Sequence, residues 1–512
     1  MTKMESLVRF SRSPVLRTGF FLLAVVVFFF GLTVPLLGPD EARYSQVARE
    51  MFLRSDWVTP TLGGFHWFEK PALLYWLQIA SYNLFGVNEF AARFGSALFG
   101  LGTALCLFFI GRTVRESDSE GSTIELGQWL AMLAVSTLGI LVFARGASFD
   151  IILTFPLTAS LVGYFIADRS EENSRRAYPG LLAFYVFMGI AVIAKGLVGI
   201  VFPFAIVGFY HLLSRRFPAK RVLLSVVWGV PVAVAAASLW YLPMYLRHGW
   251  EFIDEFFVQH HFQRYTSNKY QHPQPFHFFF WVLPLMTLPW LPFFAVGVWR
   301  AVRDIISGIT SGRTDDGTDA GARSLKPLMT FAFAWMAVPL VFFSFSGSKL
   351  PGYILPSVPA AIILAGIAAR QFALCSPARE VGIKITAIAM LVIVLGILQF
   401  ALPGFADNDS VKKLAAAAES RGFAEKRVAG FLTINHNAEF YFSGRLFRTK
   451  EGRQRKLNGP ADIPPLLREN GSEPVLLILR QEHIQHLNKD PEAVSEVLET
   501  AGEYALAIAR PR

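Results

Sequence analysis

Cysteine is scarce in this chain of 512 residues, which has only Cys106 and Cys375. Both lie in or beside apolar stretches, and they are far apart in the sequence. Two such residues cannot build a disulfide framework or the paired spacing of a cysteine zinc site. The sequence therefore excludes a disulfide-stabilised secreted domain and a zinc site made of cysteines.

Charged residues are also few. They make up 17% of the chain, whereas an ordinary soluble domain has roughly 25%. Hydrophobic residues reach 53%, and the mean hydropathy is +0.42. Apolar runs recur along the first four-fifths of the sequence, and a helix of about 20 residues crosses the hydrocarbon layer of a membrane. This composition predicts an all-α polytopic membrane protein.

Acidic residues are fewer than basic ones. The chain has 38 Asp and Glu and 48 Lys and Arg, which gives a net charge of +10. In a soluble protein that excess would suggest nucleic acid as a partner. Here the cations gather in short loops between apolar runs, as the positive-inside rule describes. We therefore expect the positive charge to reflect the loops of a membrane protein, and not the binding of nucleic acid.

Eleven apolar runs bounded by charge, Pro or Gly predict about eleven membrane helices. The first run follows basic residues like a signal peptide, but no small-residue cleavage site ends it, so we expect it to remain as a helix. The expected spans are residues 19–37, 92–111, 128–145, 149–167, 179–195, 197–213, 222–245, 278–299, 327–345, 352–369 and 382–402.

The distribution of Lys and Arg predicts the orientation of these helices. The loops that carry most cations alternate along the chain, which places the N-terminus in the cytoplasm. The loops 38–91 and 246–277 then lie outside. An odd number of spans places the C-terminus outside as well. We expect the domain at the C-terminus to lie on the outer side of the membrane.

The composition changes to that of a soluble domain near residue 405. Residues 1–404 are expected to form the membrane domain, and residues 405–512 a small α/β domain on the outer side. The pattern predicts helices and strands in alternation. The helix-like stretches are 411–421 and 491–501, and the strand-like ones are 427–433, 438–443, 474–479 and 504–508.

Several ionisable residues reach the outer face in this topology, where such groups are functional candidates by default. Asp40 and Asp150 can accept a proton or orient an acceptor. Lys70, Arg264 and Lys349 can bind a phosphate and stabilise it as a leaving group. Aromatic side chains nearby can pack against a sugar or a lipid. They are Tyr44, Trp57, Trp67, Tyr75, Trp76 and Tyr265.

Each of these residues also has a simpler interpretation. Asp40 and Asp150 could cap helices, the lysines could extend to lipid headgroups, and the aromatics could form an interfacial belt. The convergence of all of them on one membrane face favours a phosphate-linked substrate with an apolar tail.

The same residues resemble the first outer loop of the bacterial aminoarabinose transferases, which are grouped with protein O-mannosyltransferase-like GT-C glycosyltransferases. Further matching stretches follow along the membrane domain. The stretches are Asp40-Glu41-Ala42-Arg43-Tyr44, Ala48-Arg49-Glu50-Met51, Asp56-Trp57-Val58-Thr59-Pro60, Phe68-Glu69-Lys70-Pro71, Ala194-Lys195-Gly196, His261-Phe262-Gln263-Arg264-Tyr265, Pro289-Trp290 and Ser346-Gly347-Ser348-Lys349-Leu350-Pro351-Gly352-Tyr353.

This resemblance implies a GT-C fold of about 11 to 13 membrane helices in a bacterial inner membrane, with the active site and a C-terminal α/β domain in the periplasm. It implies inverting transfer of a sugar, such as 4-amino-4-deoxy-L-arabinose, from undecaprenyl phosphate to lipid A or another envelope glycolipid. It makes Asp40 and Asp150 the catalytic residues. The substrate-binding and phosphate-binding residues that it implies are Lys70, Arg264, Arg43, Tyr44, Lys349 and Tyr353.

Some members of this family bind a divalent metal ion, for which the resemblance gives Glu69 and His261 as ligands. Close relatives often have Glu where this chain has His260, and their C-terminal portion is longer. The acceptor therefore remains open between lipid A and a protein Ser or Thr hydroxyl.

A membrane transporter is an alternative of another class. Transporters place ionisable groups near the membrane midplane within inverted repeats. This sequence gathers them at one face instead and shows no repeat, which favours the enzyme.

Overall fold

A computed structural model describes residues 13–113, 126–170, 175, 177–256, 273–310, 325–487 and 492–512. The chain divides into two compact units, and each is described by itself. The first unit comprises Met1–Phe29, Glu69–Leu74 and Gly95–Val394. The second unit comprises Phe30–Phe68, Tyr75–Phe94 and Leu395–Arg512.

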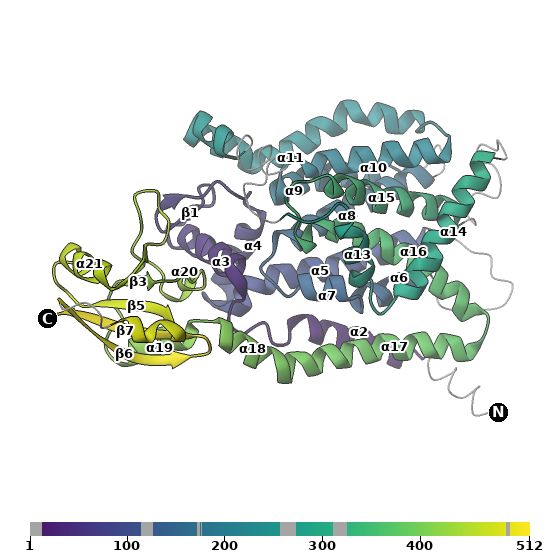
Figure 1. Cartoon of the computed structure of the whole chain (residues 1–512). Helices are drawn as coiled ribbons and strands as arrows, with labels where there is room; N and C mark the ends of the chain where they lie inside the picture. Colours follow the sequence, from purple (N-terminus) through teal and green to yellow (C-terminus); the bar gives the residue numbers. More distant parts are fainter. Residues whose placement is uncertain are drawn as a thin grey trace. The chain divides into compact units, whose positions relative to one another are not determined.

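The first unit is built of helices, labelled in Figure 1. Their apolar sequences favour helix over strand because the runs are too long for strands. The helices are α2 (Pro14–Phe29), most of α5 (Glu89–Arg112), α6 (Leu126–Val135), α7 (Leu138–Phe143), α8 (Phe149–Arg169), α9 (Ala177–Lys195), α10 (Val198–Ser214), α11 (Lys220–Ile253), α13 (Phe278–Met286), α14 (Leu291–Thr310), α15 (Lys326–Ser344), α16 (Val358–Leu374) and α17 (Pro377–Gly396).

Seven helical segments of the described chain are long and apolar enough to cross a membrane, or eight if a bent pair counts as one span. This confirms a multi-span membrane protein. The segments are Glu89–Arg112, Phe149–Arg169, Ala177–Lys195, Lys220–Phe256, Lys326–Ser344, Pro351–Leu374 and Pro377–Asp409.

The expected number of eleven spans is higher than this. Three of the expected spans fall on shorter apolar helices, α2, α6 and α10. The expected span 278–299 is broken, because α13 and α14 are bent by 119° relative to each other. Pro289 lies in the break, and a proline cannot donate the backbone hydrogen bond that continues a helix. Each expected run is therefore helical, but the runs are not all full-length spans.

Glycines let two helices of the first unit approach closely. Gly163 of α8 and Gly180 of α9 face each other, and a Cβ added to either would lie 2.7 Å from the carbonyl oxygen of the other. Small residues at a helix interface allow such backbone contact inside membranes. Helices α8 and α9 therefore lie close together, which brings the side chains at their adjoining ends near each other.

The second unit joins the loop after α2 to the C-terminal sheet. Its N-terminal part has α3 (Gly38–Leu53), the strands β1 (Thr61–Leu62) and β2 (Phe65–His66), and most of α4 (Leu73–Phe85). Its C-terminal part has α18 (Leu402–Asp409), α19 (Lys412–Ser420), β3 (Val428–Phe431), α20 (Ala438–Tyr441), β4 (Lys456–Leu457), α21 (Ile463–Glu469), β5 (Val475–Arg480), β6 (Ala493–Ala501) and β7 (Tyr504–Pro511).

The C-terminal strands form one mixed sheet in the order β4-β3-β5-β7-β6. Strand β3 is parallel to β4 and β5, whereas β7 is antiparallel to β5 and β6. Alternate residues of β5 belong to two different core clusters, with Leu477 in one and Leu476 in the other. Leu466 of α21 joins the first cluster and Leu414 of α19 the second, so helices cover both faces of the sheet.

Two expected elements of this domain were wrong. Residues 491–501 were expected to be helical, but Ala493–Ala501 forms β6, because its backbone pairs with β7 along the sheet edge. Residues 438–443 were expected to be a strand, but Ala438–Tyr441 forms the short helix α20. The predicted division of the chain at residue 404 stays a prediction, and the second unit holds the sheet together with residues 30–68 and 75–94.

Candidate functional site

Asp40 lies in the first turn of α3, where an acidic side chain is favoured by the helix dipole. It forms an ion pair with Arg43 one turn later, and its side chain is 49% exposed. The Arg43 Nε also donates to the Pro39 carbonyl at 3.0 Å. The guanidinium lies 5.7 Å from the ring centroid of Trp67. The carboxylate is thus held by a cation while it remains accessible.

A buried arginine organises the chain just before α3. Arg93, near the start of α5, is only 2% exposed. Its guanidinium donates to the carbonyl oxygens of Leu32, Val34 and Pro35 at 2.9, 2.6 and 3.0 Å. It also forms an ion pair with Glu41 at 2.6 Å. Arg93 therefore fixes the course of the loop that leads to Asp40.

Tyr44 belongs to the core of the second unit, because it is only 6% exposed. It lies on α3 one turn after Asp40. Contact between Tyr44 and a substrate stays a prediction.

Asp150 lies in the first turn of α8 in the first unit. Its carboxylate forms an ion pair with Lys195, the last residue of α9, and the two side chains are 18% and 19% exposed. Ser148 caps α8 by accepting a hydrogen bond from the Asp150 backbone N–H at 3.2 Å. The Lys195 ammonium also lies 4.9 Å from the ring centroid of Tyr353. The structure thus brings together Asp150 and Tyr353, two of the predicted site residues, through Lys195.

Gly352 borders this group. A Cβ added at Gly352 would lie 1.9 Å from the Asp150 Oδ2. Only glycine leaves room for the carboxylate at this position, so the stretch around Gly352 and Tyr353 shapes the surroundings of Asp150.

Lys70 and Glu69 form an ion pair of 3.0 Å, with side chains 12% and 15% exposed. Lys349 is 6% exposed and donates from its Nζ to the carbonyls of Ser346 at 2.6 Å and Gln274 at 3.0 Å. Lys349 therefore ties two loops of the first unit together. Its binding of phosphate stays a prediction, as does that of Lys70.

Arg264 and His261 lie outside the described residues. Among the described residues there is no group of three or more His, Cys, Asp or Glu side chains that could hold a metal ion. Glu69 is engaged with Lys70. A metal bound by Glu69 and His261 therefore stays a prediction from the resemblance.

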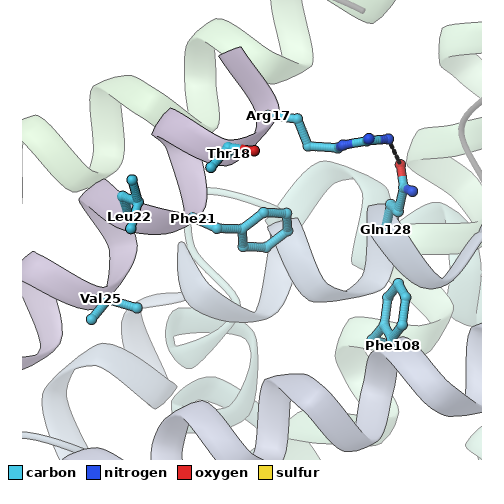
Figure 2. Close-up of a pocket in the computed structure, with 7 residues that line it drawn as sticks. All are labelled: Arg17, Thr18, Phe21, Leu22, Val25, Phe108 and Gln128. Atoms are coloured by element: carbon cyan, nitrogen blue, oxygen red, sulfur yellow. Dashed lines mark hydrogen bonds between the residues drawn. The ribbon is translucent and has the colours of Figure 1, made fainter. Parts of the chain in front are cut away.

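A hollow of about 450 Å³ lies in the first unit, and Figure 2 shows its lining. The Arg17 Nη1 donates to the Gln128 Oε1 at 3.3 Å at one side of it. The other lining residues are Thr18, Phe21, Leu22, Val25 and Phe108. This lining contains no carboxylate and none of the predicted site residues, so we do not place the chemistry there.

Two of the residues described above were absent from the predicted site. Lys195 is one of them, and its signal in the sequence is the stretch Ala194-Lys195-Gly196, which carries part of the resemblance. Arg93 was overlooked. Its signal is a cation at the start of an otherwise apolar run, which is costly unless the charge is paired.

The comparisons with known proteins support the resemblance. A family model described as dolichyl-phosphate-mannose-protein mannosyltransferase matches residues 20–259. The chain is 29% identical over 363 residues to the undecaprenyl phosphate-alpha-4-amino-4-deoxy-L-arabinose arabinosyl transferase of Serratia proteamaculans, covering 69% of this chain and 60% of the relative. It is 31% identical over 336 residues to the protein of that name from Aeromonas hydrophila, covering 65% and 56%. The matches therefore span less than two thirds of the length of these relatives.

A solved structure agrees over nearly the whole chain. The chain superposes on ArnT from Cupriavidus metallidurans bound to undecaprenyl phosphate with a TM-score of 0.72 and 24% identity, covering 96% of this chain and 97% of that one. This confirms the expected fold class, a mostly helical GT-C membrane protein with a small C-terminal sheet domain. The resemblance that the motifs indicated is confirmed as well.

Proposed function

We propose that this chain is an inverting glycosyltransferase that moves a sugar from undecaprenyl phosphate to lipid A or another envelope glycolipid. The observation that carries the proposal is the ion pair of Asp40 and Arg43 at the start of α3, inside the motif shared with the aminoarabinose transferases. The names of the similar proteins support undecaprenyl phosphate as carrier and 4-amino-4-deoxy-L-arabinose or a related sugar as cargo.

The proposed reaction is a single displacement at the anomeric carbon. Asp40 orients the acceptor and takes its proton if that oxygen carries one. The acceptor oxygen forms a bond to the anomeric carbon while the bond to the carrier phosphate breaks. Lys70 and Arg264 stabilise the charge that builds up on the departing phosphate. Without a covalent enzyme intermediate, the configuration of the sugar inverts.

Asp150 is proposed as the second catalytic carboxylate, with Lys195 setting its orientation. Arg43, Tyr44, Lys349 and Tyr353 are proposed to bind or enclose the donor. We further propose that the N-terminus is cytoplasmic and that the reaction takes place on the periplasmic face of the inner membrane.

The first test uses proteoliposomes that contain the purified chain, an undecaprenyl-phosphate sugar donor and lipid A. We expect Asp40→Asn to lower the rate by about 100-fold, because the loss of a general base costs that order of magnitude. Asp304→Asn is the control, since Asp304 lies on α14 and pairs with its neighbour Arg303 at 3.3 Å. Full activity of Asp40→Asn would contradict the role of Asp40, and an inactive native chain with every tested sugar would contradict the proposal.

The second test separates the two acceptors. The family model named for protein mannosyltransferases favours a protein hydroxyl as the alternative acceptor. Mass spectrometry of lipid A and of glycoproteins would compare cells with the native chain, with Asp40→Asn and without the chain. A sugar lost from lipid A supports the proposal, whereas a sugar lost only from proteins would establish the alternative.

A further inference from the structure

Helix α3 does not begin with a conventional cap. The residue before it, Leu37, has an apolar side chain that cannot accept a hydrogen bond, and Pro39 has no N–H to donate. Helix starts usually satisfy their first N–H groups with a polar side chain at the cap position. The Leu37 N–H donates to the Glu41 Oε2 of the same helix at 2.8 Å, so the N–H groups of Leu36 and Gly38 are the ones that need acceptors from elsewhere.

The C-terminal part of the second unit supplies one of these acceptors. The N–H of Gly38, the first residue of α3, donates to the Asp409 Oδ2 at 3.1 Å, across 371 positions of sequence. Gly38 has a φ of +62°, which favours glycine at this turn. A carboxylate at a helix N-terminus is also favoured by the helix dipole. Asp409 thus caps the helix that carries Asp40.

A tyrosine of the same domain supplies a second acceptor. The Tyr441 hydroxyl accepts a hydrogen bond from the Leu36 N–H at 2.9 Å and donates to the Glu89 Oε1 at 3.0 Å. Lys412 forms an ion pair with the same carboxylate at 2.7 Å. Burial, and then the charge of Glu89, raises the pKa of Tyr441, so its hydroxyl remains available as a donor. Tyr441 therefore links the loop before α3 to the start of α5.

Asp409 is itself held in place by the sheet domain. The Asn437 Nδ2 donates to the Asp409 carbonyl at 3.2 Å. Gly502 packs against the residue before Asp409, because a Cβ added there would lie 2.3 Å from the Asn408 carbonyl oxygen. These contacts connect the cap to the folded sheet domain.

Contacts between α3 and the C-terminal part of the second unit continue beyond the start of the helix. The Gln46 Nε2 donates to the Ser443 Oγ at 2.7 Å, and the Arg49 Nη1 donates to the Phe440 carbonyl at 3.3 Å. Figure 1 shows α20 beside α3, in agreement with the contacts between these two helices. The C-terminal domain thus contacts α3 along the helix as well as at its N-terminal cap.

We propose that the C-terminal domain is a working part of the transferase, in which Asp409 and Tyr441 are positioning residues for Asp40. By holding the N–H groups of Leu36 and Gly38, they fix the first turn of α3 and with it the direction of the Asp40 carboxylate. The expected effect on catalysis rests on the proposed function of Asp40. The hydrogen bonds that Asp409 and Tyr441 make before α3 do not depend on that function.

The experiment uses the full chain in nanodiscs with four variants. Asp409→Ala removes the acceptor, Asp409→Asn keeps an acceptor oxygen, and Tyr441→Phe keeps the ring but removes the hydroxyl. Asp407→Asn is the matched control, since Asp407 lies on the same helix and pairs with Lys413 at 2.7 Å. Hydrogen exchange of the peptide spanning residues 36–44 is measured with kcat and KM for the lipid-linked sugar.

We expect Asp409→Ala and Tyr441→Phe to speed exchange in residues 36–44 by about tenfold, the scale of a lost helix cap. We expect kcat to fall by about tenfold while KM for the donor stays within about twofold, because only the alignment of the reacting group is lost. Asp409→Asn and Asp407→Asn should stay close to the native chain in both measurements.

Unchanged exchange in Asp409→Ala and Tyr441→Phe would overturn the proposal, and so would faster exchange with an unchanged kcat. A fall in kcat without faster exchange would also overturn it. If the native chain transferred no sugar, the proposed function would fail and the catalytic part of the inference with it. The exchange data would still decide whether the domain caps α3.

Discussion

Lys195 and Asp150 form an ion pair that joins the last residue of α9 to the first turn of α8. The helices stay close because Gly163 and Gly180 allow their backbones to touch. Both charged side chains are less than a fifth exposed, so water screens the pair weakly. The position of the Asp150 carboxylate is therefore set by Lys195 and by the packing of two membrane helices.

Replacement of Lys195 by Met should lower the proposed transfer activity more than it lowers the stability of the fold. The change leaves the aliphatic volume but removes the charge that orients Asp150. We expect kcat to fall by about 10-fold to 100-fold, the range seen when an electrostatic partner in an active site is lost. Turnover in proteoliposomes measures this effect, and size-exclusion chromatography reports whether the variant remains folded.

Lys384→Met is the matched control for this change. Lys384 forms an ion pair with Glu380 at 2.6 Å on α17, with side chains 15% and 7% exposed. Its loss should affect stability but not turnover. Equal losses of turnover in both variants would show that Lys195 has only a structural role.

Replacement of Gly352 by Ala should displace the Asp150 carboxylate. The new Cβ would lie 1.9 Å from the Asp150 Oδ2, so one of the two groups must move. We expect kcat to fall by about 10-fold, since small shifts of a reacting group have effects of this size. Gly382→Ala serves as control, because a Cβ there meets nothing within 4 Å. Native turnover in Gly352→Ala would show that the position of Asp150 is not critical.

Replacement of Arg93 by Lys should loosen the loop before α3. A lysine keeps the charge, but it cannot reproduce the guanidinium fork that binds three carbonyls and Glu41. Each hydrogen bond lost from a charged donor costs about 1.5–3 kcal/mol, so we expect faster proteolysis in residues 30–68 and a lower yield. Arg303→Lys is the control, since the Arg303 side chain is 61% exposed. Unchanged proteolysis would contradict the organising role of Arg93.

The membrane helices could be predicted from sequence because the apolar runs carry the signal directly. Their ends could not be predicted as well. The expected span 278–299 is interrupted between α13 and α14, and hydropathy alone does not distinguish a straight helix from a bent pair. In the sheet domain, residues 493–501 contain Ala and Glu, which favour helix, yet pairing with β7 makes them a strand.

In the candidate site too, features that depend on neighbouring residues could be predicted, and contacts between distant residues could not. The positions of Asp40 and Asp150 in the first turns of helices could be predicted from the sequence, while their catalytic roles stay predictions. The partners of the start of α3 could not, since Asp409 is separated from Gly38 by 371 positions. Periodicity and spacing report neighbours along the chain, whereas this contact depends on how the sheet domain docks on α3.

His436 gives the second unit a specific response to pH. This side chain is half-buried, and burial, together with the positive charge of Arg43, lowers its pKa from 6.5, although Asp40 acts in the opposite direction. The unfolded chain then takes up the proton at a higher pH than the folded chain. Stability should therefore be highest above about pH 6.5 and should decrease as the pH falls through the folded pKa.

The variant His436→Gln removes this titration while it keeps a polar side chain. We expect the native chain to lose more thermal stability than His436→Gln when the pH is lowered from about 7.5 to about 5, because only the native chain must protonate a partly buried histidine beside Arg43. The measurement is the unfolding temperature of each purified protein at both values. His483→Gln, a change at a histidine near Glu482 in the same domain, controls for the loss of an imidazole elsewhere. If the native chain and His436→Gln lost the same stability, the folded chain would not lower the pKa of His436, and the prediction would be wrong.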